Sequence, residues 1–232
     1  MNFSPSRLSL SRHLWWPLLA FFAVALLLEL STFDLWLADQ LYALGGNSWR
    51  WRDAWLTRTI VHDGGRDGVG IVALVVALLA LASCCMKALR PYARGLGYLL
   101  LSALVCGLGI NLLKSFSHVD CPWDLLRYGG EFPYVRNFET HPGTFRYGAC
   151  FPAGHASAAY AWLGLYYLAR EYAPRWKGWA LATVLVLGLI FGGAQQLRGA
   201  HFLSHDVWTL GLCWFACTGL YLCCFQWGRV SR

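Results

Sequence analysis

Charge is scarce in this sequence. Charged residues make up 13% of the 232 residues and hydrophobic residues 57%, whereas about a quarter of a typical soluble domain is charged. A soluble fold would have to bury several long helices on every side in one small domain, so the composition excludes it. The charges avoid six apolar stretches of roughly 17–22 residues, the length of a helix that crosses the bilayer core. These stretches are residues 14–30, 69–86, 95–113, 153–169, 178–197 and 207–227.

The centres of these stretches hold no Asp, Glu, Lys, Arg or His. Transporters and proton pumps place such residues near the membrane midplane, so their absence argues against both classes. The first stretch is not followed by an A-x-A cleavage site, so we expect a retained helix rather than a signal peptide. The sequence therefore predicts an all-α fold: one integral membrane domain over residues 1–232, with six transmembrane helices.

Basic residues are divided unevenly between the two sides of this predicted domain. The termini and short connections on one side carry ten basic residues and a single acid, Glu171. The long connections 31–68 and 114–152, with the turn near Arg198, carry nine basic residues and nearly all the acids over more than twice the length. By the positive-inside rule, both termini are cytoplasmic and the long connections face outward. We expect a multi-pass protein of a bacterial inner membrane, and the net charge of +7 reflects this bias rather than nucleic-acid binding.

The outward connections carry three further predictions. Cys121 and Cys150 are the only cysteines in them, and in an oxidising periplasm they would form a disulfide. Residues 33–44 (FDLWLADQLYAL) are amphipathic, which is typical of a helix lying in the membrane interface. For His62, in TIVHDGGRDG, we expect a lid or hydrogen-bonding role rather than chemistry.

Polar side chains gather at the outward ends of three predicted helices. Lys114 lies where the third helix ends, and His155 opens the fourth within the sequence PAGH. The segment 197–206 (LRGAHFLSHD) joins the last two. By the predicted topology, all three clusters share one face of the membrane.

These residue types suit phosphoryl transfer. Lys114 and Arg198 can neutralise phosphate oxygens, and backbone amides at Ala153 and Gly154 would point at an anion from a helix N-terminus. Two histidines can divide a displacement at phosphorus, one as the nucleophile and the other as the acid that protonates the leaving oxygen. No carboxylate cluster of metal-site type accompanies them, so the pattern favours a mechanism without a metal or other cofactor.

The order of these clusters resembles the membrane-bound type 2 phosphatidic acid phosphatase family, whose pattern is KxxxxxxRP, then PSGH, then SRxxxxxHxxxD. Lys114 and Pro122 keep the first spacing, PAGH at 152–155 matches the second motif, and His201 matches the histidine of the third. The resemblance covers about residues 95–225.

The resemblance implies a role for each matched residue. His201 would be the nucleophile that forms a phosphohistidine, and His155 the general acid for the leaving alcohol. Lys114 would bind phosphate, together with the amide of Gly154.

The chain departs from the family pattern in four places. Cys121 replaces the arginine of the first motif, and Ala153 replaces the serine of PSGH. Ala194 and Gln195 replace the serine and the arginine that open the third motif, but Arg198, one helical turn after Gln195, could reach the same place. To supply the charge lost at Cys121, the candidates are Arg127, Arg136 and Arg146.

The fourth departure concerns the group that orients the nucleophile. His205 stands where the family has an aspartate, and Asp206 follows it. Either could orient His201. We slightly prefer Asp206, because a carboxylate stabilises the imidazolium that forms during attack.

These residues predict an enzyme that hydrolyses a phosphomonoester or pyrophosphate on a membrane lipid, with the tail left in the bilayer. Transfer of the phosphoryl group to a second lipid, for example onto or from lipid A, is the main alternative. A b-type cytochrome with His155 and His201 as axial haem ligands is a further alternative, as is a catalytically inactive binding protein. The sequence does not distinguish one lipid from another, and it predicts no oligomeric state.

Overall fold

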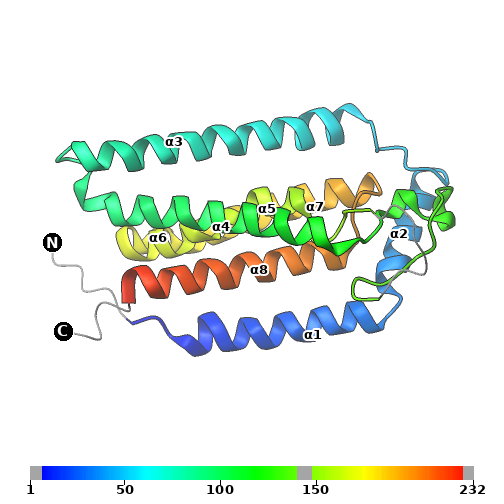
Figure 1. The fold of residues 1–232 in the computed structure, drawn as a ribbon, viewed down its shortest axis with the longest axis horizontal. Coiled ribbons are helices and arrows are strands. Elements are labelled where there is room, and N and C mark those ends of the chain that lie inside the picture. The colour runs from blue at the N-terminus through cyan, green and yellow to red at the C-terminus, as the bar shows by residue number, and fades with distance from the viewer. Residues whose placement is uncertain (1–6, 140–147, 227–232) are drawn as a thin grey trace.

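The computed structural model of the chain describes residues 7–139 and 148–226, where the fold is all-α without a β-strand. Arg146, one of the predicted cations, lies outside these ranges. The long helices run side by side as one bundle, and α2 lies across one end of it (Figure 1). The helices are α1 (Trp16–Leu30), α2 (Phe33–Leu44), α3 (Gly65–Cys85), α4 (Ala93–Ser117), α5 (Gly154–Tyr160), α6 (Gly164–Tyr172), α7 (Lys177–Leu197) and α8 (Leu203–Tyr221).

Within the described residues, five helical segments are long and apolar enough to cross a membrane. Leu74, Leu108 and Leu189 are among the many large apolar side chains that these segments expose, and extended apolar surface of this kind marks contact with a membrane. The chain is therefore a multi-pass membrane protein. The five segments are Ser11–Leu30, Leu56–Cys85, Arg90–Asp124, Pro174–Leu197 and Leu203–Gln226.

The predicted span 153–169 is helical but is not one of these five segments. It folds as α5, a 3₁₀ turn at Ala161–Leu163 and α6. This run packs against α4, α7 and α8, and Leu163 and Tyr167 are completely buried. Other helices rather than lipid enclose it, so its role in the bundle differs from that of the five exposed segments.

Glycines allow the surrounding helices to approach this central run closely. A Cβ at Gly188 on α7 would overlap the ring of Tyr160 on α5. A Cβ at Gly95 on α4 would lie 2.7 Å from the ring of Tyr172 on α6. Such small residues are the usual means of close helix packing in membranes, where no hydrophobic force draws helices together.

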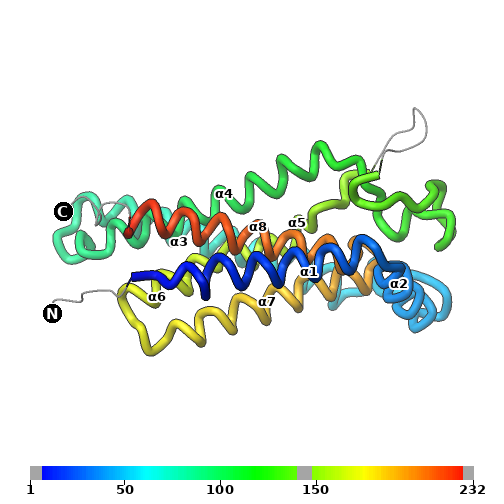
Figure 2. The backbone as a smooth tube through the Cα atoms, turned by 90° about the horizontal axis from the view of Figure 1, so that it is seen from below, coloured from blue at the N-terminus to red at the C-terminus, as the bar shows by residue number. Residues whose placement is uncertain are grey.

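The two ends of the bundle are formed by different segments of the chain. The start of α1 and the end of α8 lie at one end, and α2 lies at the other (Figure 1). The loop after α4 folds over the same end as α2 (Figure 2). The last turn of α4, the first turn of α5 and the α7–α8 turn all lie at this second end (Figure 1), so the three predicted polar clusters do share one face of the bundle.

Helix α2 has the predicted limits and is tied to the start of α8. Asp34 on α2 is buried, and its Oδ1 accepts the backbone N–H of Ser204 at 3.0 Å. A carboxylate at a helix N-terminus pairs an amide that the helix itself leaves free. The side chain of Asn137, from the loop after α4, donates to Ser204 Oγ at 3.1 Å and to Glu29 Oε2 at 3.1 Å. These bonds hold α2 and the loop over the polar end of the bundle.

Candidate active site

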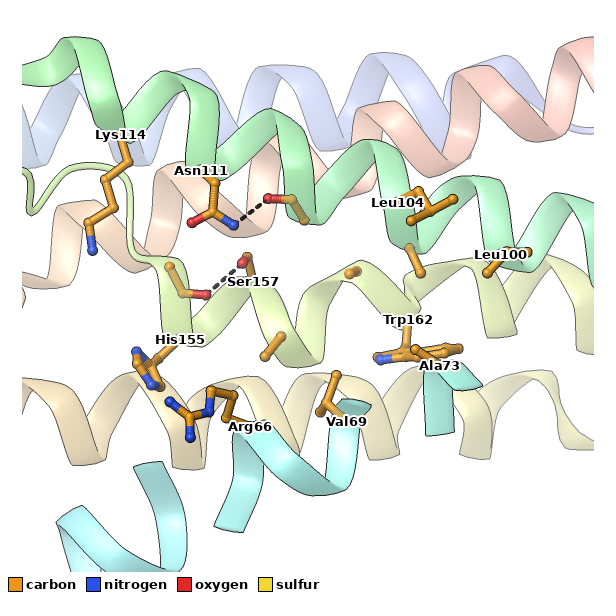
Figure 3. Close-up of a pocket in the computed structure, with 15 residues that line it drawn as sticks. Arg66, Val69, Ala73, Leu100, Leu104, Asn111, Lys114, His155, Ser157 and Trp162 are labelled. Atoms are coloured by element: carbon orange, nitrogen blue, oxygen red, sulfur yellow. Dashed lines mark hydrogen bonds between the residues drawn. The ribbon is translucent and has the colours of Figure 1, made fainter. Parts of the chain in front are cut away.

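His155 points into a cavity of about 390 Å³ between α3, α4 and α5 (Figure 3). At one end of this cavity, Arg66 from α3 and Lys114 from α4 flank the His155 ring (Figure 3). Lys114 Nζ lies beside the start of α5, because a Cβ built on Gly154 would be 3.6 Å from it. Among the described residues that line the cavity none is acidic, so this end attracts an anion.

The rest of the cavity is apolar, with Val69, Leu100 and Trp162 among its lining residues. Its two remaining polar side chains are bonded to their own helices: the Asn111 amide donates to a carbonyl on α4 at 2.9 Å, and the Ser157 hydroxyl to one on α5 at 2.6 Å. From position 100 to position 114 the cavity follows α4 for about 21 Å, at 1.5 Å per residue. One cavity therefore joins a cationic end to a long apolar channel.

His201 lies in the turn between α7 and α8, and His205 lies in the first turn of α8. The Nδ1 atoms of the two rings are 3.4 Å apart, and the residues are only 4% and 0% exposed. This contact is a hydrogen bond when one of the two Nδ1 atoms carries the proton and the other accepts it. It fixes the His201 ring and leaves Nε2 as the atom that can react.

Asp206, which the sequence slightly favoured for orienting the nucleophile, has other partners. Its Oδ2 accepts a hydrogen bond from Gln196 Nε2 at 2.6 Å, and a Cβ on Gly192 of α7 would lie 2.6 Å from the same oxygen. Adjacent helical residues point about 100° apart, so His205 faces His201 while Asp206 faces α7. In the structure, His205 rather than Asp206 is therefore the neighbour of the predicted nucleophile.

The electrostatic surroundings of His201 favour the neutral ring. Burial lowers the pKa of His201 well below its usual value, because the charged imidazolium is poorly solvated there. A proton added to His205, the charge of Lys114 and a proton added to His155 each lower the pKa further. These three groups come from α8, α4 and α5. Among the described residues, however, His201 lines a small pocket beside Asp34 and Ala38 of α2, not the cavity that His155 and Lys114 line. A neutral ring at pH 7 retains the lone pair that a nucleophile needs.

Arg198 follows α7 and is held on two sides. Its Nη1 donates to Gln195 Oε1 at 3.1 Å, and its Nε donates to the carbonyl oxygen of Arg52 at 2.8 Å. The guanidinium thus reaches the side chain at position 195, as the helical spacing predicted. It also lies close enough to His155 to interact with it electrostatically.

The two backbone amides at the start of α5 have different surroundings. The Ala153 N–H donates to the carbonyl oxygen of His205 at 3.3 Å, and the Ala153 carbonyl accepts from Thr209 Oγ1 at 3.1 Å. Ala153 therefore ties α5 to α8, and its amide is not directed at an anion. Gly154 lines the cavity and begins α5, where first-turn amides lack a partner within the helix.

These motifs match a known family model. The PAP2 superfamily model covers residues 95–229, more than half of the chain. The chain belongs to the PAP2 superfamily. Membership implies phosphoesterase activity and agrees with the cationic, two-histidine geometry. No curated protein and no solved structure matches the chain.

The predicted disulfide lies within this PAP2 region. Cys121 and Cys150 are bonded, with their Cα atoms 5.3 Å apart, and the Cys150 N–H donates to the Val119 carbonyl at 2.9 Å. The backbone of Cys150 in turn lies within hydrogen-bonding reach of the His201 and His205 rings. The bridge therefore connects the first PAP2 motif to the histidine pair.

Of the three arginines predicted to replace the missing PAP2 cation, the two that the structure describes are engaged elsewhere. Arg127 forms a bidentate ion pair with Asp39 on α2, at 2.7 and 2.6 Å, so we no longer count it as a phosphate ligand. Arg136 lies 3.6 Å from Glu139. The additional cation in the cavity is Arg66 on α3.

Two residues of the site lie outside the PAP2 match. No sequence motif predicts a chemical role for either of them. Arg66 lines the cavity, and the ring of His62 stacks on the ring of His155. Both belong to the stretch HDGGRD at 62–67, a run of titratable groups at the outward end of a predicted span. That position was the signal that could have identified them.

The histidine pair yields a test. His205→Ala should lower kcat roughly 10²- to 10⁴-fold, the range found when the group that orients a catalytic histidine is lost. Asp206→Asn, which keeps an oxygen for Gln196, should stay within about 10-fold of the wild type. Phosphate-release kinetics on the two purified variants measure both effects, and a larger loss in Asp206→Asn would restore the carboxylate as the orienting group.

Proposed function

We propose that this PAP2 protein hydrolyses a phosphomonoester or pyrophosphate on a membrane lipid. The proposal rests on one observation: a cavity whose cationic end, at Lys114, Arg66 and His155, continues into an apolar channel. The headgroup of a lipid suits the first part and its tail the second. A soluble phosphate ester would have no use for the channel.

The reaction begins with attack on phosphorus by Nε2 of neutral His201. The Nδ1–H of His201 donates to His205, which stabilises the positive charge that forms on the phosphorylated ring. Binding of the anionic phosphate favours the protonated form of His155, which then gives this proton to the departing alcohol or phosphate oxygen. Lys114 and Arg198 neutralise the charge on the phosphoryl oxygens, and the backbone N–H of Gly154 donates a hydrogen bond to one of them.

A water molecule then completes the cycle. His155, which has lost its proton to the leaving group, accepts a proton from this water while the oxygen attacks phosphorus. The bond between phosphorus and His201 breaks, and inorganic phosphate leaves. Attack by a second lipid instead of water would give a phosphotransferase. The mechanism uses no metal, so activity should persist in EDTA.

The orientation in the membrane follows from charge and topology. The helical run Gly154–Tyr172 is about 28 Å long at 1.5 Å per residue, which suffices for a sixth crossing of the hydrocarbon core. Six crossings put both termini on one side, and the excess of Lys and Arg there makes that side cytoplasmic. The active end then faces the periplasm of a bacterial inner membrane, where the Cys121–Cys150 disulfide is stable.

The direct test is phosphate release from a panel of lipid phosphates in detergent micelles. We expect the wild type to release phosphate from at least one lipid, in EDTA, and His201→Ala to be inactive on all of them. Radiolabelled phosphate distinguishes hydrolysis, which yields free phosphate, from transfer, which yields a second labelled lipid. Release by His201→Ala at the wild-type rate would refute the mechanism.

The apolar channel yields a second test. Leu104 lines the cavity and is exposed at its rim, so Leu104→Trp should obstruct the channel. We expect KM for a long-chain lipid phosphate to rise about 10-fold or more, with little change for a short-chain analogue. Leu108→Trp is the matched control, because Leu108 lies one turn away on the same helix, is exposed and does not line the cavity. An equal effect of the two variants would contradict the channel.

A further inference from the structure

His155 has a close neighbour that the mechanism above does not use. The rings of His62 and His155 are stacked, with centroids 3.8 Å apart and planes inclined by 24°. His62 belongs to the π-helical segment Leu56–Gly64, which leads into α3 and packs against α7. The stack therefore brings a residue from outside the PAP2 match against the predicted general acid.

His62 is itself held in place. Its Nδ1 lies 2.8 Å from Asp63 Oδ1, and this carboxylate fixes the proton on that nitrogen. The side chains of His62 and Asp63 are 24% and 44% exposed, so the pair stands at the boundary between the cavity and water. The bond orients the face of the His62 ring toward His155.

His155 has few other restraints on its ring. Its Nε2 is buried and has no hydrogen-bond partner within the described part of the chain. An imidazole can turn about its χ2 torsion, which is broad and weakly restrained. The flat contact with His62 restricts this rotation. Stacked rings do not present N–H to N, so the contact is not a path for a proton.

We propose that His62, oriented by Asp63, is a positioning residue that holds the general acid His155 in line with the leaving oxygen. The inference rests on the proposed phosphatase function. His62 lies in the N-terminal third of the chain, whereas the other histidines of the site lie within the PAP2 region.

The chemistry of general acids gives a selective test. An alkyl phosphate has a poor leaving group that needs the proton, whereas para-nitrophenyl phosphate has a good leaving group that does not. His62→Ala should therefore lower the rate of the phosphorylation step on octyl phosphate, measured in a single turnover, about 10- to 100-fold, within the 10²–10⁴ that a general acid supplies. On para-nitrophenyl phosphate the same step, measured as the burst of para-nitrophenol, should stay within about threefold. The later hydrolysis of the intermediate, which uses His155 as its base, should slow alike for both substrates.

Three further variants complete the experiment. His62→Phe keeps a flat ring and should recover most of the activity on octyl phosphate. Thr59→Ala, an exposed position in the same π-helical segment, should match the wild type. Adding His62→Ala to His155→Ala should cause no further loss, because a residue that acts only through His155 has no effect once that ring is gone.

The possible outcomes distinguish failure of this inference from failure of the proposed function. An equal loss in the rate of the phosphorylation step on both substrates would show that His62 merely supports the fold. An undiminished rate of this step on octyl phosphate would show that the stack is dispensable. Either result overturns the inference while leaving the proposed function intact. If the wild type releases phosphate from neither substrate nor from any lipid, the proposed function itself fails.

Discussion

A helix inside hydrocarbon leaves no place for an unpaired charge, and this constraint determines where the chain can do chemistry. The centres of the apolar segments hold no Asp, Glu, Lys, Arg or His, so the charged and histidine side chains of the site lie near helix ends. Lys114, His155 and His205 occupy the last turn of α4 and the first turns of α5 and α8. The bundle brings these ends together, and the site forms where they meet.

The helical run of α5 and α6, which other helices enclose, brings the site residues together. Because other helices surround it, its first turn places His155 among groups from α3, α4 and α8 rather than against lipid. Hydrogen bonds from the Ala153 N–H to the His205 carbonyl and from the Thr209 hydroxyl to the Ala153 carbonyl fix α5 to α8. The disulfide joins the start of the α4–α5 connection at Cys121 to its end at Cys150, so a covalent link adds to the hydrogen bonds that hold the start of α5.

Much of this arrangement could be predicted from the sequence. The limits of α2, the Cys121–Cys150 pair and the reach of Arg198 to position 195 all follow from local pattern and helical spacing. The family match over residues 95–229 agrees with the region that the motifs indicated. Local patterns sufficed because each of these features depends on residues close in sequence or on a short list of candidates.

Other features depend on tertiary packing and could not be predicted. Adjacent residues on α8 face different helices, so the choice between His205 and Asp206 was decided by the orientation of α8 about its axis. Arg127 forms its ion pair with Asp39, which lies 88 positions earlier in the sequence. The stacking of His62 on His155 joins two segments that no motif connects. Hydropathy alone also did not reveal that the run beginning at Gly154 is enclosed by protein.

The central claim is that His201 carries the phosphoryl group, and a trapped intermediate tests it most directly. The variant His155→Ala should still react with para-nitrophenyl phosphate, since this substrate needs no acid, but should hydrolyse the intermediate slowly for want of a base. After an alkaline quench, mass spectrometry should find an acid-labile phosphate on the peptide that contains His201. Phosphate on any other residue, or turnover without a phosphorylated enzyme, would contradict the account.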